Sequence, residues 1–411
     1  MQATRGPGSK VRQKPVVARA AQGLVSVEWD LAAKNPPLLS ALLAREPWIA
    51  ARLPGLRTRP PFARVSASFR STAYFRPVGH NRAFYFLGPS GSVLAFKGTE
   101  VLAEDAGETI RQMSWHAPLD LSPLERLARI EQKIPMALLL EEAMAEAEKA
   151  CDLQAAYWRR YGSLADVPVP LLVLRWQPSL CDAFVEKHQG ALSVRAQASV
   201  RRLARDGLAV YVYYYPNPPL RVRHLVDRLP EVSLGYRKRQ GELARRVEIE
   251  EVVRRWIKLV VRMLGLGYFP CSPCHDEVGQ CLREQNAVLD GGLVDMDSIC
   301  EMASIADEGE FVETLMVTLV ELLGTVHNLW VDRSKSWSPR QSRTGLVTVL
   351  LVWQQVLAEL KAAMLREEED GTVFDARVKK LLFAGASFSE VDAALALLYG
   401  RRIEKKQEQF G

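Results

Sequence analysis

The sequence predicts an α+β protein of two lobes, with a β-rich N-terminal lobe followed by a mainly helical C-terminal lobe. Short apolar runs bounded by turn residues dominate the first half of the 411-residue chain, and long amphipathic patterns dominate the second half. Pro216-Asn-Pro-Pro separates the halves, because this segment sustains neither a helix nor a central strand. We therefore expect an N-terminal lobe over residues 23–215 and a C-terminal lobe over 216–402.

The composition is that of a soluble globular protein, with 48% hydrophobic and 25% charged residues. No apolar run approaches the roughly 18 residues that a membrane span requires, so we expect no membrane partner. Residues 1–22 form a predicted disordered arm whose five basic residues and no acid account for +5 of the formal charge of +6. We interpret the arm as a solvated tail rather than a nucleic-acid or acidic-partner site, and residues 403–411 as a charged tail.

Six cysteines without an export signal indicate a reducing cytoplasm.

The N-terminal lobe opens with an alternating run from Leu24 to Asp30 and a helix from Pro37 to about Ala51. Turn residues separate the β runs that follow, and a strong helical pattern begins at Ile134. The predicted strands cover 64–69, 72–75, 83–87, 92–97, 167–175 and 208–215, with a helix over 193–205. Helices of the second lobe are predicted over 241–266, 310–328, 344–367, 375–383 and 389–401.

Lys97 ends an apolar strand, where an ammonium can reach nucleotide phosphates from the floor of a sheet. Glu141 and Glu142 lie between apolar positions of the helix that follows, so a glutamate there could orient Lys97. Gly88-Pro-Ser-Gly91-Ser lies between the last two strands of the first sheet. That turn is either a phosphate-covering loop, with Gly88 and Gly91 contacting the cofactor, or an ordinary hairpin turn.

The residues from Gly265 to Ile299 are the richest in groups that carry chemistry. Two apolar runs, Ala287-Val-Leu and Leu293-Val, flank Asp290-Gly-Gly and predict a tight hairpin. The hairpin would hold Asn286 at its start and Asp295 and Asp297 after its end. An amide oxygen and carboxylates are ligands that Mg²⁺ accepts, so we expect a magnesium site here.

The same stretch contains Cys271, Cys274 and Cys281, with His275 beside the second and Cys300 just beyond. This set could hold structural zinc, but only one pair has the tight spacing of zinc ligands. We therefore favour reduced, partly buried thiols over a zinc site.

The order of strand lysine, helix glutamate, two strands, hinge, helix and Asn-hairpin-Asp resembles the protein-kinase-like fold. Leu94-Ala-Phe-Lys97-Gly-Thr and Glu142-Ala-Met locally resemble the selenoprotein O family of AMP-transferring pseudokinases. The resemblance implies ATP and Mg²⁺ as cofactors, with Lys97 contacting phosphate and Glu142 pairing with it. It implies Asn286 as a metal ligand and either Asp295 or Asp297 as the main metal aspartate.

The chain lacks the His-Arg-Asp and Asp-Phe-Gly strings of protein kinases, which leaves the general base unassigned between Asp276 and Glu284. We expect an ATP- and Mg²⁺-dependent phosphoryl- or adenylyltransferase whose acceptor is a protein or a small molecule. One alternative is a carboxylate-adenylating synthetase of the siderophore type, because Glu284-Gln-Asn286 with His275 upstream is similar to its His-x-Gln-Asn segment. Another is a kinase-like or zinc-stapled module that only binds a partner.

Overall fold

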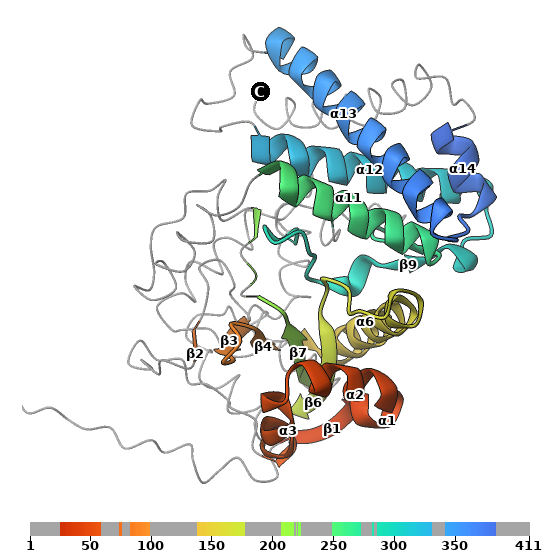
Figure 1. The fold of residues 1–411 in the computed structure, drawn as a ribbon. Coiled ribbons are helices and arrows are strands. Elements are labelled where there is room, and N and C mark those ends of the chain that lie inside the picture. The colour runs from red at the N-terminus through yellow and green to blue at the C-terminus, as the bar shows by residue number, and fades with distance from the viewer. Residues whose placement is uncertain are drawn as a thin grey trace, which may run out of the picture.

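The structure, a computed structural model, is a mixed α+β protein built on an antiparallel sheet and several long helices (Figure 1). It describes residues 25–58, 74–75, 83–98, 138–176, 207–217, 219, 221–222, 249–272, 282, 286–330 and 342–383. Within these ranges, no helix has the length and apolar character needed to cross a membrane. The α+β class expected from the sequence is confirmed.

A seven-stranded sheet contains the strands of the first half of the chain, in the order β1-β6-β7-β4-β3-β2 with β5 paired to β7. All described pairings are antiparallel, and Lys97 of β4 lies opposite Tyr211 of β7. The strands are β1 (Val25–Asp30), β2 (Tyr74–Phe75), β3 (Ala83–Leu87), β4 (Val93–Lys97), β5 (Leu138–Leu139), β6 (Val169–Trp176) and β7 (Leu208–Tyr215). Strands β4 and β7 are buried along their whole length, as central strands of a covered sheet are.

The first described strand of the chain, β1, belongs to this sheet, since it pairs with β6 and forms an edge. Three short helices follow: α1 (Leu31–Lys34), α2 (Pro36–Arg45) and α3 (Trp48–Thr58). Helix α2 starts where the sequence favours it, because the Asn35 side chain caps it by accepting a hydrogen bond from Leu38 N and Pro36 occupies the first turn.

Helix α6 (Leu140–Tyr161) packs against β6 and β7 and runs from the sheet to the helical half (Figure 1). It begins later and ends later than the sequence predicts, because Leu138 and Leu139 pair with β7 as β5. Its first turns contribute Ala143 and Ala147 to the core under the sheet, and its last turns contribute Leu153 and Tyr157 to the core of the helical half. One helix therefore belongs to both cores.

The second half of the described chain is mainly helical. Figure 1 shows α11, α12 and α13 grouped beyond the sheet. The elements are α11 (Ile249–Gly265), β8 (Tyr268–Phe269), β9 (Cys300–Glu301), α12 (Glu308–Trp330), α13 (Ser342–Glu369) and α14 (Ala376–Phe383), with two 3-10 turns, η2 (Met296–Ser298) and η3 (Met302–Ser304). Their ranges agree with four of the five predicted helices. The fifth, over 389–401, lies outside the described residues, as do the predicted strand 64–69, the helix 193–205, the N-terminal arm and the tail.

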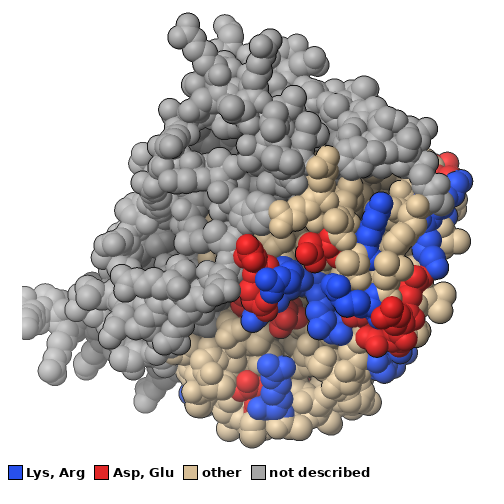
Figure 2. All heavy atoms as spheres, turned by 45° about the horizontal axis from the view of Figure 1, so that its top comes forward, with Lys and Arg blue, Asp and Glu red and all other residues tan. Residues whose placement is uncertain are grey.

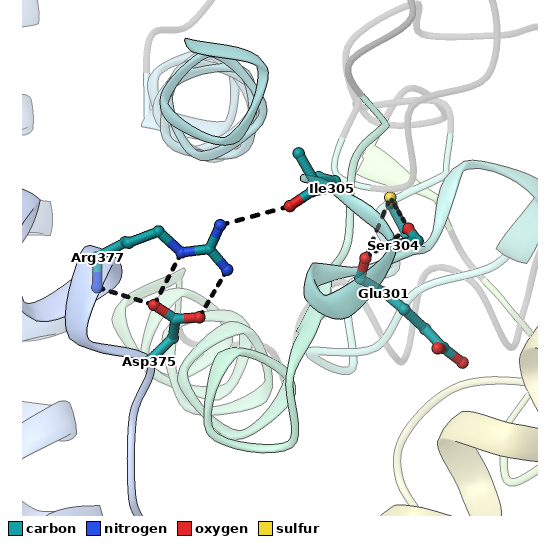
Figure 3. A network of polar contacts seen from close by, with 6 residues as sticks. Glu301, Ser304, Ile305, Asp375 and Arg377 are labelled. Atoms are coloured by element: carbon teal, nitrogen blue, oxygen red, sulfur yellow. Dashed lines mark hydrogen bonds and ion pairs between the residues drawn. The ribbon is translucent and has the colours of Figure 1, made fainter. Parts of the chain in front are cut away.

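An arginine fixes the start of α14 to the segment that follows β9. The Arg377 guanidinium donates to Asp375 at 2.8 and 3.1 Å and to the Ile305 carbonyl oxygen at 3.4 Å, and it lies 3.6 Å from the centroid of the Phe311 ring (Figure 3). In the same view, Ser304 Oγ donates to the Glu301 carbonyl oxygen at 2.7 Å. The Arg377 contacts hold the start of α14 against Ile305 and Phe311.

Acidic and basic side chains lie beside each other on the face shown in Figure 2 rather than in patches of one sign. Helix α11 illustrates this mixing, since Arg254 pairs with Glu250 and Glu251. Exposed pairs of this kind each contribute little to stability.

The predicted hairpin is confirmed over Ala287–Val294. Ala287 bridges Leu293, Val288 N donates to Gly292 O at 2.9 Å, and Gly291 takes the left-handed conformation with φ 96°. Alternate side chains point to opposite faces, as in any strand. Val288 and Val294 enter the core of the sheet, whereas Leu289 and Leu293 enter the core of the helical half.

The hairpin turn is packed too tightly for a larger residue at Gly292. A Cβ added there would overlap the Tyr215 hydroxyl and the Asp166 carbonyl oxygen, which belong to two other segments. The Trp256 indole of α11 also donates to Val288 O at 3.1 Å and Gly292 O at 3.2 Å. The turn is therefore the point where β7, the loop before β6 and α11 meet.

We predict that Gly292→Ala lowers the free energy of unfolding by about 1–3 kcal/mol, because the backbone around the added methyl group must shift. Gly55→Ala is the matched control. No atom lies within 4 Å of its added Cβ, and alanine is the better helix former in α3. Urea unfolding of both variants checks this, and equal stabilities would contradict the packing described.

Candidate functional site

Lys97 is the last residue of β4 and lies in the interior of the protein. Its side chain is only 10% exposed, and because a lysine is almost never buried without a partner, we expect an acidic group beside it. The strand delivers the ammonium group to the gap between α6 and the end of the hairpin. The sequence-based position of Lys97 at the end of a buried strand is confirmed.

Glu146 of α6 is the glutamate that pairs with Lys97. Lys97 Nζ donates to Glu146 Oε2 at 2.6 Å, and the Glu146 side chain is 2% exposed. The prediction that Glu142 is this partner is wrong, because Glu142 lies one helical turn earlier and is exposed, as Glu141 is. Both positions lie on one side of α6, but the second turn of the helix, not the first, reaches the end of β4.

Asp295 is the second carboxylate that pairs with Lys97. Its Oδ1 accepts a hydrogen bond from Lys97 Nζ, and its Oδ2 lies 3.9 Å from Arg221 Nη1. Asp295 has φ 62°, and it is the non-glycine residue with positive φ among the described residues. This backbone turn ends the hairpin and directs the carboxylate to the site. Non-glycine residues in this conformation are found preferentially at functional sites.

Asn286 and Asp297 lie on either side of Asp295. Asn286 is 2% exposed, and its backbone carbonyl oxygen accepts a hydrogen bond from Val294 N at 2.9 Å, so its backbone is adjacent to the end of the hairpin. The Lys149 ammonium of α6 donates to the Asp297 carbonyl oxygen. Asp297 is an exposed residue, yet protein atoms crowd its carboxyl group and remove part of its hydration. This desolvation, together with the charge of Asp295, raises the pKa of Asp297 to about 7.

Gly88 and Gly91, predicted to contact the cofactor, do not lie at this site. They form the β3–β4 hairpin turn, which is at the opposite end of β4 from Lys97, and strands rise ~3.3 Å per residue. The turn faces a carboxylate instead, because Ser90 Oγ donates to Glu46 Oε2 at 2.9 Å and the Trp48 indole donates to the same oxygen at 2.6 Å. An acidic partner at this turn is unfavourable for a phosphate.

Burial alone would raise the pKa of Glu46, but hydrogen bonds from Ser90, Trp48 and Tyr214 outweigh it and lower the pKa. Glu46 therefore stays ionised and ties the lead-in helices to the sheet. Its contacts with the described residues are structural, because they join the residues after α2 to the sheet.

The other predicted site residues cannot be placed beside Lys97. Asp276 and Glu284, the candidates for a general base, lie outside the described residues, and so do Cys274, His275 and Cys281. Cys271 is buried, and Cys300 Sγ lies 3.6 Å from Ser304 Oγ. Among the described residues, no group of three or more His, Cys, Asp or Glu side chains could hold a metal ion.

Sequence reasoning missed Glu146, Arg221 and Lys149. Arg221 follows the proline-rich segment, where no periodic pattern points to a function. Lys149 lies three residues after Glu146 on the same helix. Its contact with the Asp297 carbonyl oxygen depends on how α6 packs against the residues after the hairpin, which the sequence does not show.

The site thus contains an ammonium group held between two carboxylates, with a guanidinium close to one of them. Charges this close stabilise one another, because water is largely excluded. A ligand that separates Lys97 from Asp295 must replace the partner that each one loses. It must therefore present negative charge to Lys97 and positive charge to Asp295.

No protein-family model matches the chain, and a search of curated proteins finds no match.

We predict that Glu146→Gln lowers the free energy of unfolding by about 1–3 kcal/mol, the range for a hydrogen bond to a charged group. Glu142→Gln, in the same helix, should change it by less than about 0.5 kcal/mol because the side chain is exposed. Urea unfolding at neutral pH measures both. If Glu142→Gln proved the more damaging change, the assignment of Glu146 as the partner of Lys97 would fail.

A second carboxylate, Asp290, lies in the hairpin turn. It accepts from Gly292 N at 3.0 Å, from Asn217 Nδ2 at 3.2 Å and from the Tyr215 hydroxyl at 3.4 Å. Burial raises the pKa of Asp290 to about 6, and the charge of Asp166 adds to this shift. Because the folded-state pKa is above the value of 3.8 for a free aspartate, protonation of Asp290 favours the folded state.

The stability contributed by this protonation is complete below about pH 4 and is lost as the pH rises through about 6. Asp290→Asn removes the titration but keeps an oxygen acceptor for Gly292 N. We predict that it has near wild-type stability at pH 4 and is more stable by about 3 kcal/mol at pH 8. Unfolding at a series of pH values tests this, and parallel curves for the two proteins would contradict it.

Proposed function

We propose that the site around Lys97 binds ATP with Mg²⁺ and transfers either a phosphoryl or an adenylyl group. The observation that carries the proposal is the position of Lys97, a strand lysine between a helix glutamate and the aspartate that follows a hairpin. In protein kinases a strand lysine pairs with a helix glutamate beside a metal-binding aspartate, and both must be in place for transfer. Glu146 and Asp295 provide the two acids here.

The arrangement of the chain supports a two-lobed, kinase-like organisation. One hydrophobic core lies around the sheet and another around α11 to α14, and the chain passes between them after Tyr215. The hairpin and α6 contribute to both cores, so the catalytic groups would lie where the two lobes meet. Such a junction is a common place for a ligand site.

The donor groups fit magnesium. Asp295 offers one carboxylate, and Asn286 is paired through its backbone with Val294, the residue before Asp295. Mg²⁺ at phosphate sites is held in this way, by one or two protein oxygens with the remaining ligands from phosphate and water. Asp295 with Asn286 would hold the ion, which supplies positive charge that neutralises the phosphates during transfer.

The remaining roles belong to the chain itself. Lys97 would contact the phosphates, and Glu146 would keep its ammonium group oriented, since a buried ion pair restricts the lysine side chain. A separate general base is not essential, because phosphoryl transfer depends mainly on positioning and charge neutralisation. Asp276 and Glu284 remain the candidates for that role.

Titration calorimetry with ATP in the presence of Mg²⁺ tests the proposal. Wild-type protein should bind Mg²⁺-ATP, and Asp295→Asn and Asn286→Ala should each weaken binding by about tenfold or more. The first removes the negative charge that holds the metal, and the second removes the amide oxygen. Asp290→Asn is the control. This aspartate bonds to the hairpin turn and the hinge, so its loss should change the affinity less than twofold.

Wild-type affinity in Asp295→Asn would defeat the proposal and favour a module that only binds a partner. If the protein binds Mg²⁺-ATP, incubation with ATP labelled separately on the α and γ phosphates identifies the group that is transferred. Label from the α phosphate on a protein acceptor indicates adenylyl transfer, and an acyl-adenylate indicates the carboxylate-activating alternative.

A further inference from the structure

Arg221 is a second cation at the candidate site, and it lies near the carboxylate oxygen of Asp295 that does not bond to Lys97. Its guanidinium Nη1 lies 3.9 Å from Asp295 Oδ2, and its side chain is 18% exposed. Two hydrogen-bonding features fix its backbone to the hairpin, a bridge between Arg221 and Val288 and a bond of 3.0 Å from Val222 N to Ala287 O. Arg221 is therefore held in register with the aspartate that it faces.

The sheet floor near Arg221 is made of buried tyrosines. Burial raises the pKa of Tyr85, and the positive charge of Arg221 opposes that rise. Burial likewise raises the pKa of Tyr213 well above its ordinary value, so both phenols stay neutral at physiological pH. The sheet therefore gives Arg221 a neutral surface, and Asp295 is the described anion with which it pairs.

Lys97 and Arg221 thus converge on one carboxylate. A metal ion on Asp295 would place like charge next to both, which is unfavourable at distances of a few ångströms unless another anion intervenes. Phosphate oxygens supply that anion, and the planar guanidinium matches two oxygens of a phosphate at once. The arrangement requires a ligand in which metal and several phosphate oxygens enter together.

We propose that Arg221 is a phosphate-binding residue of this site, that it acts jointly with Lys97, and that the pair selects a nucleoside di- or triphosphate with its metal over a monophosphate. This inference rests on the proposed function. Lys97 comes from the sheet and Arg221 from the segment after Tyr215, so a phosphate chain of sufficient length contacts groups on both sides of the site. A monophosphate that bonds to both cations leaves few oxygens for the metal on Asp295, whereas a longer phosphate chain can engage the two cations and the metal together.

Arg221→Gln tests the inference by calorimetry with Mg²⁺-ATP and with AMP. We expect the variant to bind Mg²⁺-ATP about tenfold to a hundredfold more weakly, the range for a charged hydrogen bond to phosphate, and AMP less than threefold more weakly. Arg221→Lys keeps the charge and should recover part of the loss. Arg254→Gln, which removes an exposed arginine of α11, should bind both ligands as the wild type does.

Equal losses for Mg²⁺-ATP and AMP in Arg221→Gln, or no loss for either, would overturn the role of Arg221. If wild-type protein binds Mg²⁺-ATP and only this pattern fails, the proposed function stands without the inference. If wild-type protein does not bind Mg²⁺-ATP, the proposed function fails and the inference fails with it.

Chemical modification supplies the test should Arg221→Gln not fold. Phenylglyoxal labels accessible arginines, and mass spectrometry of the wild-type protein reports the site. Mg²⁺-ATP should slow the labelling of Arg221 at least fivefold, AMP should not, and neither should affect Arg254. Labelling of Arg221 that Mg²⁺-ATP leaves unchanged would overturn the inference.

Discussion

The buried charge of Lys97 is the constraint on which the site depends. An ammonium group removed from water costs several kcal/mol unless it is paired and hydrogen-bonded. Here the compensation comes from two segments far apart in the chain, Glu146 of α6 and Asp295 after the hairpin. The protein can keep Lys97 inside only if β4, α6 and the hairpin stay together, so the position of this one charge links the sheet to the helical half.

The hairpin and α6 satisfy that constraint because each of them packs into both hydrophobic cores. The hairpin alternates its side chains between the cores, and α6 changes from one core to the other along its length. Trp256 holds the hairpin turn from α11, and the buried Gln154 of α6 donates to Val167 O at 2.8 Å and accepts from Ala165 N at 3.0 Å in the loop before β6. Helix α6 and the hairpin are thereby fixed at separate points near the site, which keeps Glu146 and Asp295 in contact with Lys97.

Local patterns predict the described strands of the large sheet other than β5, whose residues they assign to the helix that follows, and they predict the hairpin and the strand-end position of Lys97. Alternation marks a strand wherever it lies, and Asp290-Gly-Gly specifies a tight turn. The partner of Lys97 was misplaced by one helical turn, because Glu142 and Glu146 share a side of α6 and only tertiary packing selects between them. The chain order alone places the Gly88 turn at the start of β4 and Lys97 at its end, whereas Arg221 gave no periodic signal. Long-range contacts decide such points, and a single sequence does not contain them explicitly.

A crystal structure with Mg²⁺ and a non-hydrolysable ATP analogue would show directly whether the nucleotide binds at Lys97. We expect a phosphate oxygen within hydrogen-bonding distance of Lys97 Nζ, the metal on an Asp295 oxygen, and Glu146 still paired with Lys97. A nucleotide bound elsewhere, with the contact between Lys97 and Asp295 intact, would contradict this expectation.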